Sequence, residues 1–282
     1  MQLSQESFQR AADILRESDG LLICAGAGMG VDSGLPDFRG NQGFWKAYPA
    51  LAKSGYEFST VASTRTFEID PMLAWGFYGH RLNLYRKTVP NPGFAILQRW
   101  AQRMASGWFV VTSNVDGQFQ KAGFDEQRIY EVHGSIHHLQ CTKPCTGEAW
   151  SADDFTPEVD EDTCSLMNAW PRCPRCRRMA RPNILMFGDW QWNDTPTFIK
   201  RRVFAHWANR VERLAIVEIG AGTAIQTIRM VSESQGLKSQ LIRINPREAD
   251  IPLGVKGVSL ASNGIDSLAA VDGFLSEWHG GS

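Results

Sequence analysis

Residues 21–40, LLICAGAGMGVDSGLPDFRG, decide the fold, because an apolar run leads directly into closely spaced glycines. The run over residues 21–25 is short and continuously apolar, as is typical of a buried strand. The glycines at positions 26, 28 and 30 let backbone N–H groups approach a diphosphate closely at the start of a helix. The stretch therefore predicts a strand followed by a phosphate-binding turn, although a tight turn without a ligand has the same pattern.

Similar apolar runs alternate along the chain with segments that carry apolar residues at helical spacing. This alternation is the signature of an α/β fold with a parallel sheet. We expect strands at residues 21–25, 108–112, 129–132, 183–187, 214–219, 240–244 and 258–260. We expect the covering helices near residues 8–16, 93–104, 196–208, 224–234 and 265–278.

Two segments interrupt the alternation. One is rich in aromatic side chains and suits helices, and the other holds two cysteine pairs around an acidic middle. The expected fold is therefore a Rossmann-like parallel-sheet domain with a smaller helical and zinc-binding lobe. The sheet domain comprises residues 1–40, 88–137 and 182–282, and the lobe comprises a helical insertion at 41–87 and a zinc-binding module at 138–181. We expect a ligand in the cleft between the two.

The composition disfavours several classes of protein. Of 282 residues, 43% are hydrophobic and 21% are charged, which suits a folded core rather than disorder. Lys and Arg number 29 against 30 Asp and Glu, so neither nucleic acid nor a membrane surface is an expected partner. No apolar run approaches the roughly 18–20 residues that cross a bilayer, and the polar N-terminus lacks signal-peptide features. We expect a cytoplasmic protein, and the sequence does not indicate its oligomeric state.

Four of the six cysteines form two closely spaced pairs. Thiolates at such spacing suit tetrahedral zinc with no open coordination position, which makes the predicted site structural rather than catalytic. Reduced thiols without metal are the alternative. Cys164 lies between the pairs and is expected to be a bystander. The predicted ligands are Cys141, Cys145, Cys173 and Cys176.

The segment after the glycine-rich turn departs from an ordinary dinucleotide-binding fold. Such a fold has a second strand that ends in an acidic residue near position 50, whereas residues 48–53, YPALAK, offer no strand. Residues 35–40, LPDFRG, instead resemble the signature of the sirtuin family of NAD-dependent protein deacylases, a GAG loop running into G-[IL]-P-D-F-R.

Further motifs similar to those of the family follow in the same order. They are TSNVD at residues 112–116 for T-Q-N-I-D, HG at 133–134, PNILMFGD at 182–189 for P-x-[IV]-V-x-F-G-E, GTA at 222–224 for G-T-S, and Asn245. The resemblance spans roughly residues 20 to 275. It implies NAD as cofactor and an acyl-lysine protein or peptide as partner.

The resemblance also implies a cofactor site. Asp116 would hold the nicotinamide carboxamide and Asn114 would assist at the ribose, although both residue types also form simple turns after strands. Phe38 would shield the reactive carbon, Arg39 would neutralise the diphosphate, and Asp37 would contact the cofactor or pair with Arg39. The expected cofactor-binding residues are Gly26, Ala27, Gly28, Asp37, Phe38, Arg39, Ser113, Asn114, Asp116, Gly222, Thr223 and Asn245.

His133 follows the expected strand at residues 129–132, and an imidazole suits proton transfer from a ribose hydroxyl at neutral pH. In the mechanism that the resemblance implies, the acyl oxygen attacks the anomeric carbon to give an alkylimidate. His133 activates the ribose hydroxyl that attacks the imidate, and hydrolysis yields lysine and O-acyl-ADP-ribose. A lone histidine at a strand end is otherwise often structural, as we expect of His137 and His138. The expected catalytic residues are His133, Asn114 and Asp116.

Two segments are expected to bind the acylated substrate. Met186, Phe187 and Gly188 would form an exposed edge to which the substrate adds as a strand, as the resemblance implies, whereas the alternative is an ordinary buried strand. Tyr78 and Arg81 are three residues apart on one helix face. They resemble the Y-x-x-R pair of sirtuins that remove succinyl and malonyl groups by binding the distal carboxylate. The alternative is that Tyr78 packs in the small lobe while Arg81 points to solvent.

Two departures from the family pattern concern the cofactor. Gly30 stands where most sirtuins have Ser, and Ser113 stands where they have Gln. Three hypotheses follow: a protein-lysine deacylase, a mono-ADP-ribosyltransferase or NAD glycohydrolase on the same scaffold, and a non-catalytic NAD-binding module. The presence of all three expected catalytic residues argues against the last. The first two differ in whether release of nicotinamide requires an acyl-lysine peptide.

Overall fold

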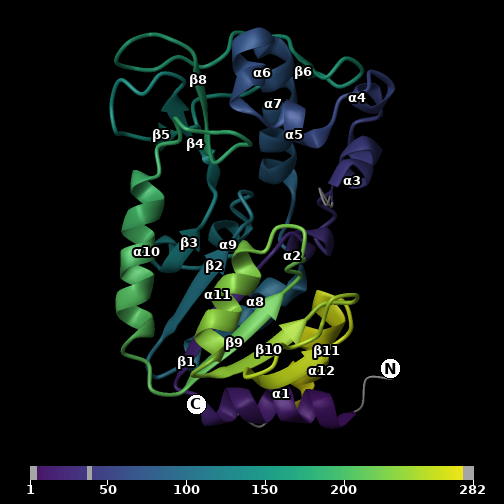
Figure 1. Ribbon diagram of the computed structural model, residues 1–282, viewed down its shortest axis with the longest axis vertical. Coiled ribbons are helices and arrows are strands. Elements are labelled where there is room, and N and C mark those ends of the chain that lie inside the picture. The colour runs from purple at the N-terminus through teal and green to yellow at the C-terminus, as the bar shows by residue number, and fades with distance from the viewer. Residues whose placement is uncertain (1–4, 37–39, 276–282) are drawn as a thin grey trace.

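A six-stranded parallel sheet organises the chain in the computed structural model, which describes residues 5–36 and 40–275 (Figure 1). The strand order is β11-β10-β9-β1-β2-β3, and every neighbouring pair is parallel. The chain moves outward from β1 in both directions, so the crevice beside the end of β1 is the place where such sheets bind ligands. The strands are β1 Gly20–Ala25, β2 Trp108–Thr112, β3 Ile129–Glu131, β9 Leu214–Ile219, β10 Gln240–Ile244 and β11 Lys256–Leu260.

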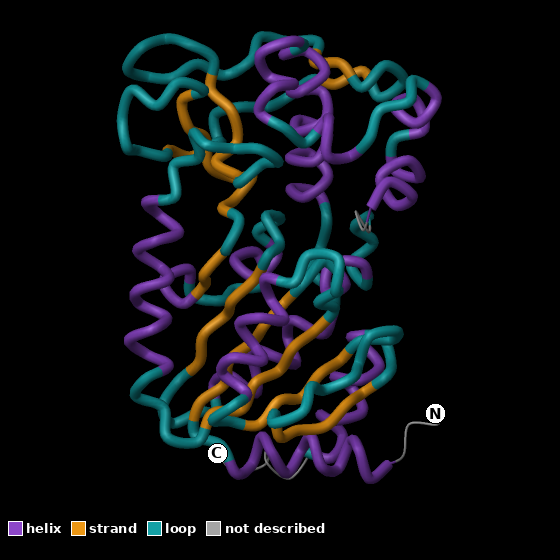
Figure 2. The backbone as a smooth tube through the Cα atoms, viewed as in Figure 1, coloured by secondary structure: helices purple, strands orange, loops and turns teal. Residues whose placement is uncertain are grey.

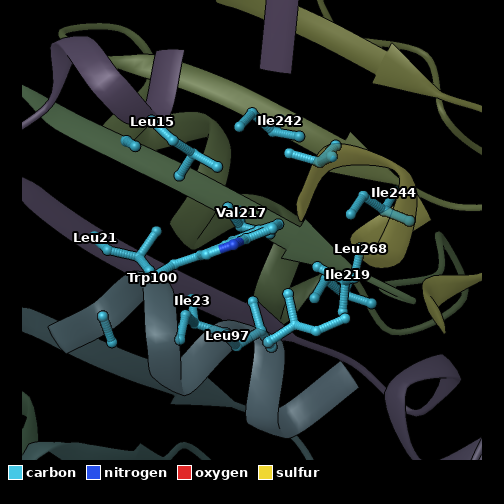
Figure 3. Packing of buried hydrophobic residues seen from close by; sticks show 14 of the residues in the cluster. Leu15, Leu21, Ile23, Leu97, Trp100, Val217, Ile219, Ile242, Ile244 and Leu268 are labelled. Atoms are coloured by element: carbon cyan, nitrogen blue, oxygen red, sulfur yellow. The ribbon is translucent and has the colours of Figure 1, made fainter. Parts of the chain in front are cut away.

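Helices cover both faces of this sheet, which is why its central strands are apolar on both sides. Leu21 and Ile23 of β1 belong to the apolar cluster under α1, α8 and α12. Leu22 and Cys24 belong to the cluster under α10 and α11. Figure 3 shows the first face, where the Trp100 ring of α8 lies among aliphatic side chains of the strands. These helices are α1 Gln5–Glu17, α8 Pro92–Gln102, α10 Thr195–Ala208, α11 Thr227–Gly236 and α12 Gly264–Phe274.

Side-chain caps explain where two of the helices begin. Asn91 accepts a hydrogen bond from the Gly93 N–H at 2.9 Å, and Pro92 occupies the first helical position of α8. Asn263 accepts from the Asp266 N–H at 2.9 Å at the start of α12. Each cap satisfies a backbone donor that the helix itself leaves unpaired.

A second part of the structure consists of short helices around the buried helix α7 and a three-stranded antiparallel sheet, β5-β4-β8 (Figure 2). Its apolar cluster is separate from the two on the parallel sheet and includes many aromatic rings. The elements are α3 Gly40–Ala47, α4 Pro49–Lys53, α5 Phe58–Val61, α6 Thr64–Ile69, α7 Pro71–Lys87, β4 Gly134–Cys141, β5 Trp150–Ser151, β6 Val159–Asp160, β7 Ser165–Leu166 and β8 Ala180–Ile184. Three short helices complete the structure: α2 Gly28–Val31 follows β1, and α9 Gln118–Lys121 and the 3-10 helix Glu126–Arg128 lie between β2 and β3.

The strand expected at residues 183–187 differs from the prediction. The observed strand β8 ends at Ile184 and pairs antiparallel with β4 rather than joining the parallel sheet. Two buried polar side chains explain the difference, because Arg181 pairs with Asp189 at 2.8 Å and Asn183 donates to Gln140 at 3.1 Å. An apolar run in the sequence predicts a strand but does not show which of two sheets that strand joins.

The other expected strands and helices are present, with ends displaced by a few residues. The helix expected at 224–234 begins at Thr227, and the one expected at 265–278 is described as far as Phe274. The predicted boundary between residues 137 and 138 falls inside β4, and the domain limits stay a prediction. Within residues 5–36 and 40–275, no helix combines the length and apolarity needed to span a bilayer.

The two cysteine pairs meet beside the antiparallel sheet. All four Sγ atoms lie within 4.8 Å of one another, and Cys164 is outside the group. Facing sulfurs are 3.6 Å apart for Cys141 and Cys176 and 3.5 Å apart for Cys145 and Cys173. Tetrahedral zinc with Zn–S bonds of about 2.3 Å places its sulfurs about 3.8 Å apart. The donor set and its spacing therefore fit one zinc ion.

We expect purified, reduced protein to contain one zinc per chain, and the Cys173→Ala variant to lose it. Because a structural zinc contributes directly to folding, the variant should also unfold at a lower temperature. Metal analysis and thermal unfolding measure the two effects. Cys164→Ala is the control, since it removes a buried thiol but should keep the metal. Wild-type protein without zinc would contradict the prediction.

Candidate active site

A cavity of about 970 Å³ lies at the carboxyl ends of β1, β2 and β9, where they face α7 and the segment after β8. Its wall includes Gly26 and Ala27 from the turn after β1, and Gly222 and Thr223 from the turn after β9. The volume is in the range of ordinary small-molecule sites. The residues that line the cavity come from segments that are far apart in the sequence.

The turn after β1 packs directly on the turn after β9. The Gly26 N–H donates to Ile219 O at 2.9 Å and the Gly28 N–H donates to Gly220 O at 3.1 Å. A Cβ at Gly26 would lie 2.6 Å from Gly220 O and 2.7 Å from Ala221 Cα. No side chain fits there, so this part of the cavity wall is bare backbone, as a phosphate site requires.

The loop after β2 carries polar side chains into the same cavity. Asn114 Nδ2 donates to Gly26 O at 3.1 Å, which ties this loop to the glycine-rich turn. Asp116 is 7% exposed, and its Oδ1 accepts from the Gln118 N–H at 2.9 Å. Burial raises the pKa of Asp116 to about 6, against the lowering effect of that hydrogen bond and of Arg81. Ser113, Asn114 and Asp116 all line the cavity.

His133 lines the cavity next to this loop, two residues after the end of β3. Burial lowers the pKa of His133, and a hydrogen bond with the Ser113 backbone opposes that effect. The imidazole is therefore neutral at and above neutral pH. A neutral imidazole in a partly buried wall is able to accept a proton.

Gly30 faces the Asp116 carboxylate. A Cβ at position 30 would lie 3.5 Å from Asp116 Oδ2 and 3.1 Å from Leu35 Cδ1. The departure from the family's Ser therefore removes a side chain that would point at Asp116. Glycine at position 30 supplies no hydroxyl donor to the Asp116 carboxylate, and burial is the largest influence on the pKa of Asp116.

The expected acyl-binding pair lies on α7 in the cavity wall. Arg81 is 8% exposed, and its guanidinium carbon is 5.3 Å from the Phe77 ring centroid and 5.8 Å from that of Tyr78. Arg81 Nε and Nη2 donate to the Tyr85 hydroxyl at 3.0 and 2.7 Å. Tyr78, Arg81 and Tyr85 all line the cavity, so Arg81 does not point to solvent. Tyr85 was not expected from the sequence, and its only signal is the i, i+4 spacing from Arg81.

The segment after β8 forms the opposite wall. Met186 is 5% exposed and Phe187 45% exposed, and both line the cavity. The Leu185 N–H donates to His133 O at 2.9 Å, and the Phe187 N–H donates to Ala62 O at 3.1 Å. The backbone of Phe187 is therefore already paired with the segment at Ala62 and Ser63.

Some expected site residues lie elsewhere. Gly28 and Gly188 are not in the cavity wall, and Asn245 lies behind it, with its side-chain amide donating to Ala221 O at 2.9 Å. The wall also contains Glu248, which accepts hydrogen bonds from the Thr223 N–H and hydroxyl. No sequence signal pointed to Glu248. Asp37, Phe38 and Arg39 lie outside the described residues.

Comparisons with known proteins agree with this architecture. A "NAD-dependent protein deacylase" of Pyrococcus furiosus is 32% identical over 176 residues, which cover 62% of this chain and 64% of that protein. A protein of the same name from Aquifex aeolicus is 26% identical over 83% of this chain and 87% of its own length. The solved structure of a Sir2 homologue–NAD complex has a TM-score of 0.70 at 21% identity, and covers 98% of this chain and 95% of that one. At that identity the structural match shows the fold alone.

The match to the first of these relatives spans somewhat less than two thirds of its length. A model of the Sir2 family matches residues 26–217, from the glycine-rich turn to β9. That range is more than half of the chain and contains most of the cavity wall. The chain therefore belongs to the Sir2 family.

Proposed function

We propose that this protein is an NAD-dependent protein-lysine deacylase, which moves an acyl group from lysine to the ADP-ribose part of NAD and releases nicotinamide. The observation that carries the proposal is that one cavity brings together a bare backbone turn, a buried carboxylate and a neutral imidazole. These are Gly26, Asp116 and His133, which come from the ends of three strands or the loops that follow them. Lysine and O-acyl-ADP-ribose are the proposed products.

The cavity wall suits NAD at both ends of the molecule. The bare backbone at Gly26 would face the diphosphate, and Thr223, whose N–H and hydroxyl donate to Glu248 in this structure, would lie on the adenosine side. Asn114 and Asp116 would hold the nicotinamide side, because an ionised carboxylate accepts a hydrogen bond from a carboxamide N–H. Bound NAD supplies an electrophilic ribose carbon and a nicotinamide leaving group.

His133 is the proposed general base. Its lowered pKa keeps the imidazole unprotonated at neutral pH, and the ring lines the cavity beside the proposed ribose site. A proton from a ribose hydroxyl would pass to His133 as that oxygen attacks the acyl carbon. Leu185 bonds the His133 carbonyl and so fixes the backbone of the proposed base.

The zinc site is proposed to be structural. Its four cysteines leave no open coordination position, and none of them is in the cavity wall. The metal would hold the segment that connects β4 to β8.

Gly30 favours a second activity, hydrolysis of NAD or transfer of ADP-ribose to another acceptor. A Cβ at position 30 would lie against Leu35 Cδ1 and Asp116 Oδ2, so glycine leaves the Asp116 carboxylate without the side-chain neighbour that the family has there. If this activity dominates, nicotinamide is released from NAD without any acyl-lysine peptide. If deacylation dominates, release depends on the peptide. Measuring free nicotinamide with and without an acetyl-lysine peptide separates the two functions.

Replacement of His133 by Ala should lower deacylation by about 10²–10⁴-fold, because that is the usual loss on removing a general base. NAD binding should stay within about an order of magnitude, since His133 is not proposed to hold the cofactor. Mass spectrometry of an acetyl-lysine peptide and titration with NAD measure the two quantities. Undiminished turnover in the variant would refute the role of His133.

Replacement of Gly30 by Ser should shift the acid limb of kcat/KM for NAD to lower pH. Asp116 must be ionised to accept the carboxamide N–H, and its pKa is about 6. A hydroxyl beside Oδ2 stabilises the ionised form and lowers that pKa, so activity persists to lower pH. Gly30→Ala is the matched control, because it adds the Cβ without the hydroxyl. Equal shifts in both variants would show that the hydroxyl has no effect on Asp116.

We propose that the acyl pocket accepts succinyl-lysine as well as acetyl-lysine. Burial raises the pKa of Tyr78 to about 12, so its hydroxyl remains a donor beside the Arg81 cation. A cation and a neutral phenol in one wall suit the distal carboxylate of an acyl chain. The cation is already bonded to Tyr85, so a neutral acetyl group does not leave it without a partner.

The Arg81→Met variant should lose about 10-fold or more of its turnover on succinyl-lysine, because a charge-assisted hydrogen bond contributes about 1.5–3 kcal/mol. Turnover on acetyl-lysine should change much less. Arg86→Met is a control from the same helix, since Arg86 bonds the Phe155 and Ala152 carbonyls and is not in the cavity wall. It should affect both peptides equally. Equal losses on both peptides in Arg81→Met would leave Arg81 a structural residue.

A further inference from the structure

A bulge in β4 takes three residues out of the pairing with β8 and turns two of them toward the loop after β2. In the pairing of β4 with β8, Ser135 lies opposite Asn183, but the next paired residue, Leu139, lies opposite Pro182. Four steps along β4 therefore correspond to a single step along β8. Bulges of this kind re-aim side chains and are common beside active sites. The residues between the paired positions are Ile136, His137 and His138.

Two donors of the bulge bond successive carbonyl groups of the loop. The Ile136 N–H donates to Val115 O at 3.0 Å, and His137 Nε2 lies 2.9 Å from Asp116 O. A carbonyl oxygen is only an acceptor, so the hydrogen of this second bond is on Nε2. The Asp116 backbone is thus held from the β4 side while its carboxylate faces the cavity.

The shape of the loop depends on the His137 ring as well. Gly117 has a φ of +70°, and a Cβ there would lie 2.7 Å from His137 Cδ2 and 2.8 Å from Nε2. The ring therefore packs directly on the backbone that follows Asp116, and only glycine fits beneath it. The Gln118 N–H then closes the turn on Asp116 Oδ1 at 2.9 Å.

We infer that His137 is a positioning residue, whose Nε2–H holds the Asp116 carbonyl and thereby directs the Asp116 carboxylate into the cavity. The inference rests on the proposed function, in which Asp116 holds the nicotinamide carboxamide. His137 itself does not line the cavity, so it acts through Asp116. Burial also lowers the pKa of His137, so the donor is neutral and brings no extra positive charge to Asp116.

His138 provides a matched control within the same strand. It has the same side chain but pairs across the ladder with Ser151 of β5, away from the loop. From the sequence alone, both histidines are predicted to be structural residues. The bulge separates them, because it turns only one of the two rings onto Asp116.

The experiment compares His137→Leu, His137→Gln, His137→Asn and His138→Leu in the full-length protein. Three quantities are measured: the inhibition constant of nicotinamide, the KM for NAD, and the dissociation constant of ADP-ribose, which lacks nicotinamide. His137→Leu should raise the first two by about 10-fold, since it leaves a buried acceptor unpaired. Binding of ADP-ribose should change by less than about 2-fold, and His138→Leu should match the wild type in all three.

The two polar variants keep the test decisive if His137→Leu folds poorly. Gln places a side-chain N–H near the position of Nε2 and should restore nicotinamide affinity, whereas Asn is too short to reach Asp116 O. A loss of ADP-ribose affinity equal to that for nicotinamide would show a general structural role and overturn the inference. Equal behaviour of the Gln and Asn variants would also overturn it.

The Asp116→Asn variant distinguishes failure of the inference from failure of the proposed function. If Asp116→Asn leaves nicotinamide inhibition unchanged, the proposed role of Asp116 is wrong. If Asp116→Asn weakens inhibition and His137→Leu does not, the role of Asp116 stands and the positioning role of His137 is wrong.

Discussion

The contact of bare backbone between the turns after β1 and β9 is the constraint on which the site depends. Gly26 lies so close to Gly220 O that any Cβ would have to displace the main chain. The contact brings the ends of the central strands together and leaves main chain rather than side chains on this part of the cavity wall. Two amides extend it, since Asn114 bonds the Gly26 carbonyl and Asn245 bonds the Ala221 carbonyl. The loops after β1, β2, β9 and β10 therefore converge on one point, and the cavity opens where they meet.

The antiparallel sheet supports the other side of the cavity. His133, the proposed base, comes directly before β4, and its carbonyl accepts a hydrogen bond from Leu185, which comes directly after β8. The buried pair of Arg181 and Asp189 closes the loop that follows, with both side chains almost fully buried. Removing one partner of such a pair typically costs about 3–5 kcal/mol, because the other charge stays buried. The position of the imidazole thus depends on packing in a part of the chain far from the parallel sheet.

The sequence predicts most of the parallel sheet and only part of the site. Strands such as β2, β9 and β10 are visible because both of their faces are covered and most of their residues are apolar. The strand β8 is misplaced because Arg181 and Asn183 are buried through partners that the local sequence does not show. Motifs locate His133 and Asp116, since each follows a strand end. Tyr85, Glu248 and the bulge at His137 escape prediction because each depends on contacts between segments brought together only by folding.

The cavity wall contains two buried charged groups, Arg81 and Asp116, which compensate for the loss of hydration in different ways. The Arg81 cation is stabilised by the Tyr85 hydroxyl and by aromatic rings. The Asp116 carboxylate has few donors, and burial therefore raises its pKa into the physiological range. A group that is already satisfied tolerates both neutral and anionic acyl chains. A group that is poorly satisfied gains most when a ligand supplies a new donor, which is what a carboxamide would do. In the proposed function, the same low dielectric environment would thus make the proposed acyl end of the cavity permissive and the proposed nicotinamide end selective.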